Sequence, residues 1–176
     1  MKYYFTAVLM ILLMSKPGKC QKGSVWLSGG PSMGFAVSNK NFSYYYKNGI
    51  GGNLQANFGT AQLGSVTAHL SYLSFGAKNL PVTDASSSTL LKAGYQTYFL
   101  NSGFFVGADA GFSFYGYGIF SGRTRFVAGA TIGYSFKIAK NNYINIFPSY
   151  NQVFSTPNNN KWLIANICYR FGLNKK

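Results

Sequence analysis

Apolar and polar residues alternate with a period of two over most of the chain after Met14. In the stretch 123–138, RTRFVAGATIGYSFKI, the even positions from Phe126 to Ile138 are apolar or aromatic, and the odd positions are mainly Arg, Gly, Thr, Ser and Lys. This alternation is typical of strands with one apolar face. The predicted strands are 25–35, 49–58, 63–75, 89–99, 103–115, 123–138, 143–153 and 162–171.

The connections between these strands alternate in length. The long or polar connections are 38–48, 77–88, 116–122 and 155–161, and the tight ones are 59–62, 100–102 and 139–142. Long loops at one end and short turns at the other are typical of an up-and-down outer-membrane barrel. No helical periodicity of useful length follows Met14.

Composition indicates which strand face meets water. Charged residues make up 10% of the chain, whereas soluble surfaces carry about 25–35%. With the apolar faces turned inward, bulky aromatic residues would have to fill a narrow interior. The opposite arrangement places apolar residues against lipid and Gly, Ser, Thr, Asn and a few ions inside.

Strands that span a bilayer must close on themselves, because open edges would leave backbone groups unpaired. The predicted fold is therefore all-β, an eight-stranded antiparallel up-and-down transmembrane β-barrel. A bulge or local break is expected at Pro148, which has no N–H to donate. Aromatic residues near the short-turn ends are predicted to form an interfacial girdle: Tyr95, Phe99, Phe104, Tyr134, Phe136, Tyr169 and Phe171.

The N-terminus has the layout of a secretory signal peptide. Lys2 precedes the apolar run 5–14, which is half the length needed for a membrane-spanning helix. We expect a signal peptide at 1–20, a barrel domain at 21–176 and export to the outer membrane. Lipidation of Cys20 is the alternative, although the residues before it lack the leucine and the adjacent small residue of a lipoprotein signal.

From about residue 23 to 172 the chain resembles small β-barrel proteins of the Gram-negative outer membrane, of the porin-family or outer membrane protein beta-barrel domain type. The resemblance is carried by VWLSGGPSMGFAVS, GFFVGADAGFSFYGYG and the terminal CYRFG. It implies that a terminal aromatic residue, here Phe171, is recognised by the barrel-assembly machinery. It implies no catalytic activity.

The candidate site is a polar cluster lining the lumen. The tight turn at 100–102 joins two strands into a hairpin in which Asp109 faces Lys92 or Gly94, so we expect a Lys92–Asp109 ion pair. The predicted cluster comprises His69, Lys92, Gln96, Asp109 and Arg125.

The tripeptide His69-Leu70-Ser71 is similar to the His-x-Ser of outer-membrane lipid A deacylases. The chain contains no Glu, and His69 and Ser71 share the predicted lumen face, whereas lipid chemistry needs a lipid-facing site. We therefore interpret His69 as a hydrogen-bonded lumen residue and predict no enzymatic activity. One His and one mature Cys cannot form a zinc site, and no metal or cofactor is predicted.

The chain is strongly basic. Loss of Lys2, Lys16 and Lys19 with the leader lowers the formal charge from +14 to +11. Strand alternation scatters the cations, which argues against a nucleic-acid partner. Expected partners are outer-membrane lipid and lipopolysaccharide, whose phosphates would meet loop lysines, together with an unknown surface partner at the long loops. Scattered solvated lysines are an equally good interpretation. The loop lysines concerned are Lys40, Lys47, Lys78 and Lys161.

Three functions remain open from the sequence. The first is a structural or surface-interaction barrel with a largely filled lumen, because eight strands leave little interior space. The second is a narrow pore for small solutes, which small Gly and Ser lumen residues would allow. The third is a lipid A deacylase-like hydrolase.

Overall fold

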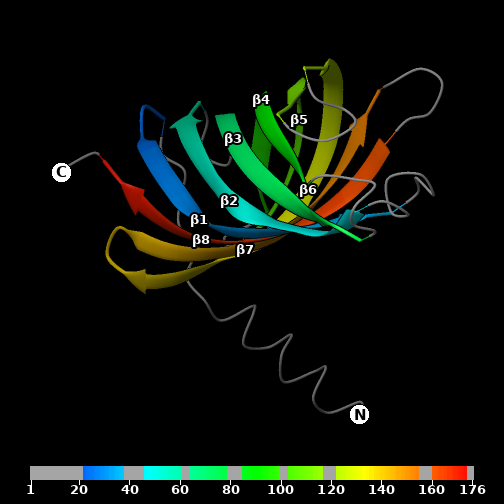
Figure 1. The fold of residues 1–176 in the computed structure, drawn as a ribbon. Helices are drawn as coiled ribbons and strands as arrows, with labels where there is room; N and C mark the ends of the chain where they lie inside the picture. The colour runs from blue at the N-terminus through cyan, green and yellow to red at the C-terminus, as the bar shows by residue number, and fades with distance from the viewer. Residues whose placement is uncertain are drawn as a thin grey trace, which may run out of the picture.

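Eight antiparallel strands form the protein in a computed structural model that describes residues 22–37, 46–60, 64–78, 85–99, 103–116, 122–154 and 160–173 (Figure 1). No helix in these ranges has the length and hydropathy needed to cross a bilayer. The predicted signal peptide and most of the long loops lie outside the described residues. The strands are β1 Val25–Ala36, β2 Tyr46–Gly59, β3 Gly64–Ala77, β4 Ser86–Tyr98, β5 Phe104–Tyr115, β6 Thr124–Ala139, β7 Asn142–Val153 and β8 Asn160–Gly172.

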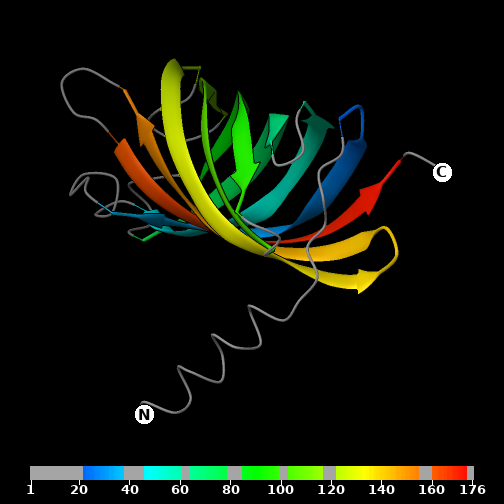
Figure 2. The same ribbon diagram turned by 180° about the vertical axis from the view of Figure 1, so that it is seen from behind.

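The sheet is a closed barrel. Each strand pairs with the next one along the chain, and β1 also pairs with β8, from Trp26 opposite Gly172 to Ala36 opposite Trp162. Figures 1 and 2 show the tilted strands curving around a common interior. The predicted number, order and closure of the strands are confirmed. The loop side of the barrel is the end at which β2 begins, and the turn side is the end at which β2 finishes.

Three strands begin two or three residues earlier than the apolar alternation indicated. The strand β2 begins at Tyr46, β4 at Ser86 and β8 at Asn160. Polar residues occupy these loop-side ends, yet their backbones pair in the ladders, as Ser86 does with Phe75. Backbone pairing, which side-chain hydropathy does not report, sets these boundaries.

Pro148 interrupts one ladder without shifting it. On the β6 side, Thr131 pairs with Ser149 and Tyr134 with Ile146 in one unchanged register, while the pairs between them are missing. On the β8 side Pro148 pairs with Ala165. The expected irregularity is therefore a local break and not a bulge, because proline cannot donate a ladder hydrogen bond.

The two faces of the strands differ as predicted. In β3, Leu70 is 42% exposed and its neighbour His69 is 6% exposed; in β4, Leu91 is 52% exposed and Lys92 is 2% exposed. The apolar face therefore points outward. Most of the predicted girdle is also outside, with exposed fractions of 37–47% for Tyr95, Phe99, Phe136, Tyr169 and Phe171.

The lumen holds the expected Ser, Thr, Asn and a few ions, and it also holds apolar residues that the expectation did not include. Buried apolar and aromatic side chains fill its loop side, with the Phe75 and Trp162 rings 5.4 Å apart. We call this set the loop-side plug: Tyr46, Leu73, Phe75, Leu90, Tyr115, Val127, Val153, Trp162 and Ile164. Leu73 and Phe75 occupy the same alternate positions of β3 as His69, so the sequence pattern already placed these apolar residues on the inward face.

A second, smaller apolar cluster lies toward the turn side. It consists of Tyr98, Phe105, Phe147 and Cys168. The polar residues Lys92, Asp109 and Asn151 lie between these two clusters along β4, β5 and β7.

Candidate functional site

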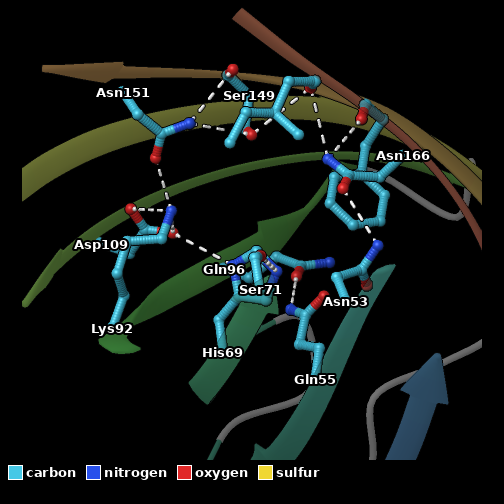
Figure 3. Close-up of polar contacts among 12 residues, drawn as sticks. Asn53, Gln55, His69, Ser71, Lys92, Gln96, Asp109, Ser149, Asn151 and Asn166 are labelled. Atoms are coloured by element: carbon cyan, nitrogen blue, oxygen red, sulfur yellow. Dashed lines mark hydrogen bonds and ion pairs between the residues drawn. The ribbon is translucent and has the colours of Figure 1, made fainter. Parts of the chain in front are cut away.

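The central feature of the lumen is an ion pair between adjacent strands. Asp109 on β5 faces Gly94 on β4, and Lys92 lies diagonally beside it, one inward position closer to the loop side. The Lys92 Nζ lies 2.9 Å from Asp109 Oδ2 and donates to Oδ1 at 3.0 Å. The predicted hairpin register and ion pair are confirmed. Nζ also donates to Asn151 Oδ1 of β7 at 2.6 Å, so the pair ties three strands together (Figure 3).

Two glycines make room for the Asp109 carboxylate. Asp109 lies directly between Gly94 of β4 and Gly129 of β6 in the two ladders. A Cβ added to Gly94 would lie 2.7 Å from Asp109 Cβ, and one added to Gly129 would lie 2.5 Å from Asp109 Oδ1. A side chain at Gly129 would therefore displace the carboxylate, whereas one at Gly94 would first meet the backbone oxygen of Ala108.

His69 and Ser71 extend the network along β3. Ser71 Oγ is 3.0 Å from His69 Nε2, and His69 Nδ1 is 3.9 Å from Asp109 Oδ2 (Figure 3). This is the order of a serine–histidine–aspartate triad. However, Ser71 is only 1% exposed, it faces the lumen, and Asp109 is engaged by Lys92. The arrangement satisfies buried polar groups and offers no route for a lipid substrate.

Gln96 belongs to a neighbouring network. Gln55 Nε2 donates to Gln96 Oε1 at 3.1 Å, and Gln96 Nε2 donates to the Tyr98 hydroxyl at 2.9 Å. Gln96 also lines, with His69 and Asp109, a polar cavity of about 20 Å³. Such a cavity has room for about one water molecule. The prediction that Gln96 and His69 lie near the ion pair is thus confirmed.

Arg125 lies apart from the rest of the predicted cluster. It faces Ser113 on the loop side of Asp109. The hydrogen bonds and ion pairs found for His69, Lys92, Gln96 and Asp109 in the described part of the chain do not involve Arg125. The same part of the chain contains no group of three His, Cys, Asp or Glu residues able to hold a metal ion.

Asparagine residues from distant strands complete the network, and the sequence reasoning did not single them out. Asn53 Nδ2 donates to Ser32 Oγ at 2.7 Å and to Asn166 Oδ1 at 3.0 Å, which joins β1, β2 and β8. Asn151 Nδ2 donates to Ser149 Oγ at 3.1 Å. Their inward parity is visible in the sequence, but which strands they join is set by the closed barrel.

Arg170 is a second cation that the predicted site omitted. Its guanidinium lies over the rings of Trp26, Tyr98 and Tyr143 at 4.6, 5.2 and 5.7 Å, and Nη1 donates to the Tyr98 hydroxyl. The side chain is 1% exposed. Cation–π contacts of this kind stabilise a desolvated guanidinium. Arg170 thereby packs the turn side of the lumen.

Within the part of the chain that the structure describes, several buried polar atoms without a hydrogen-bond partner lie toward the turn side. Ser135 and Asn145, which face each other across β6 and β7, carry two of them. Buried groups of this kind are normally satisfied by ordered water. We therefore expect the turn side to be the hydrated part of the lumen. The atoms are Asn57 Nδ2, Ser65 Oγ, Ser135 Oγ, Asn145 Oδ1 and Arg170 Nε.

Replacement of Gly129 by alanine should destabilise the barrel by about 1–3 kcal/mol, because overpacking displaces the Asp109 carboxylate. The matched control is Gly52→Ala, where the added Cβ would meet only Gly30 O at 3.4 Å. Urea unfolding of the refolded proteins in lipid vesicles measures both. Equal stability of the two variants would show that the carboxylate is not confined as described.

The Lys92–Asp109 pair should behave as one unit in a double-mutant cycle. Lys92→Met and Asp109→Asn should each cost roughly 3 kcal/mol of unfolding free energy, since each removes one partner of a buried pair. The double variant should cost clearly less than their sum, whereas Lys47→Met at the exposed loop-side end of β2 should have little effect. Additive effects in urea unfolding would contradict the coupling.

Comparison with known proteins reveals similarity of structure only. No family model and no curated protein matches the sequence. The structure is similar to Neisserial surface protein A (NspA), with a TM-score of 0.64 and 14% identity over 88% of this chain and 98% of that one. It is also similar to the Yersinia pestis attachment invasion locus protein Ail, with a TM-score of 0.53 and 16% identity over 86% and 100%.

A third neighbour is the outer membrane protein OprG of Pseudomonas aeruginosa. It has a TM-score of 0.51 and 12% identity over 90% of this chain and 96% of that one. Each neighbour is matched over nearly its whole length, so the likeness concerns the complete barrel. The chain has the closed eight-stranded fold found in these outer-membrane proteins.

Proposed function

We propose that the protein is an integral outer-membrane β-barrel with a structural or surface-interaction role and a filled, non-conducting lumen. The observation that carries the proposal is a closed barrel with an apolar outer wall and an interior occupied by its own side chains. The loop-side plug fills one end, and the Lys92–Asp109 network crosses the middle. The outer-membrane folds of the structural neighbours support this placement.

The narrow-pore alternative is less well supported. A pore needs a continuous wet path, but Leu73, Val127 and Val153 are fully buried within the plug. The hydrolase alternative is also disfavoured, because Ser71 faces the lumen and lipid would surround the opposite strand face. The role we propose is therefore not enzymatic.

The loop side is the proposed contact surface for partners. Lys47 and Lys78 are exposed at the ends of β2 and β3, and Lys161 lies at the start of β8, whereas Lys40 lies outside the described residues. These cations suit the phosphates of lipopolysaccharide, which would surround this end of an outer-membrane barrel. One structure of Ail contains the heparin analogue sucrose octasulfate, and a polyanionic surface partner would suit the same lysines here. During biogenesis the barrel-assembly machinery is the expected partner.

Membrane placement predicts a heat-dependent change in gel mobility. The folded barrel should migrate faster in an unheated denaturing gel than after boiling, because closed hydrogen-bonded strands resist detergent until heated. The protein should also fractionate with the outer membrane. Recovery in the cytosol with residues 1–20 retained would contradict the placement.

The filled lumen predicts no single-channel conductance. Purified protein inserted into a planar lipid bilayer should give no well-defined current steps, because the plug and the polar network occupy the interior. Phe75→Ala combined with Trp162→Ala removes two neighbouring rings of the plug and serves as the variant in which leakage is expected. Regular steps from the unaltered protein would favour the narrow-pore alternative.

A further inference from the structure

A row of alanines crosses the outer wall of the barrel. Five alanines on β2 to β6 lie directly opposite one another in four consecutive ladders. They share the outward face with exposed leucines such as Leu70 and Leu91. Direct pairing makes the row a continuous strip of low relief. Its members are Ala56, Ala68, Ala93, Ala110 and Ala128.

Large side chains border the row. On the loop side, each alanine has a leucine or phenylalanine two positions away on its own strand. These residues are Leu54, Leu70, Leu91, Phe112 and Phe126. On the turn side Phe58, Val66 and Tyr95 form the opposite border along β2 to β4. Over β2 to β4 the row is therefore the floor of a furrow between two apolar borders, whereas on β5 and β6 the turn-side neighbours are Ala108 and Ala130.

The furrow widens into an apolar groove of about 450 Å³ between β8 and β4. Ala56 and Ala68 lie at its centre, and Leu54, Leu70 and Leu91 line its loop side. Gly29 of β1 gives room to Leu54, whose Cδ2 would lie 2.8 Å from a Cβ placed there. The groove is thus a property of several strands in register and not of the alanines alone.

The course of the groove fits one leaflet of a bilayer. It begins beside Tyr169 and Phe171 at the turn-side end of β8 and reaches Leu91 midway along β4. Since aromatic residues of this kind mark the interface with the headgroups, the groove runs from the interface toward the middle of the apolar layer. An acyl chain of a phospholipid follows the same path from its headgroup.

A cation lies at the end where that headgroup would be. Lys22 is exposed and precedes β1, whose Leu27 lines the groove. A lysine near the interface attracts anionic headgroups. Charge and apolar shape therefore indicate the same kind of ligand on the same side of the barrel.

We propose that this groove binds one acyl chain of an anionic glycerophospholipid of the turn-side leaflet, with the lipid phosphate close to Lys22. The inference rests on the proposed membrane placement and adds a specific lipid site to it. The Ala56 and Ala68 floor holds the chain, and the leucine border separates it from the loop-side leaflet.

The test uses the full mature chain reconstituted in phospholipid vesicles that contain a phosphatidylglycerol with a photoreactive diazirine in its acyl chain. After illumination, mass spectrometry should find labelled residues concentrated on β1 to β4. Ala56→Leu combined with Ala68→Leu fills the floor and should reduce this labelling to the level of β5 to β7. The matched control, Ala130→Leu, adds the same side chain to the outer face of β6 and should leave it unchanged.

Lys22→Gln should remove the preference for phosphatidylglycerol over phosphatidylcholine and leave chain labelling in place. Even labelling around the barrel, or labelling that survives filling of the floor, would overturn the proposal, as would crosslinks showing a second copy of the chain in the groove. The heat-dependent gel shift, measured on the same vesicles, distinguishes failure of the lipid site from failure of the membrane placement. A shifted barrel with even labelling refutes the lipid site alone, whereas absence of an inserted barrel refutes the membrane placement.

Discussion

Closure of the sheet through the β1–β8 ladder is the constraint on which the rest of the structure depends. Backbone N–H and C=O groups in a bilayer find no partners outside the protein, so an unpaired edge would cost several kcal/mol for each group. The ladder from Trp26 to Ala36 removes both edges at once. It tolerates Pro31, where the β1–β8 pairs are interrupted while the register stays the same on either side.

Closure with eight strands creates a narrow interior, and this interior dictates what the inward side chains must do. A charge such as Lys92 can be there only if it is paired, and Asp109 and Asn151 supply its partners at 2.9 and 2.6 Å. The buried Arg170 guanidinium is stabilised instead by cation–π contacts with three aromatic rings. Because the interior is filled in this way, the surfaces available for contact with other molecules are the outer wall and the two ends.

The two ends of the lumen differ in chemistry. The loop-side plug is apolar and closely packed, with Leu73 and Leu90 fully buried. Toward the turn side, atoms such as Asn145 Oδ1 and Arg170 Nε have no hydrogen-bond partner among the described residues. The apolar barrier at the loop side suits the proposed barrel, which presents a surface and conducts nothing.

The sequence by itself determined the number of strands, their order and the face that each residue occupies, because a period of two is a local property of the chain. Through the short 100–102 connection it also determined that Lys92 and Asp109 meet. The tertiary structure alone decided that Asn151 joins this pair, that Gly94 and Gly129 flank Asp109, and that the alanines of five strands align on the outer wall. These contacts depend on register between strands joined by long loops and on closure of the barrel, and no local period encodes either one.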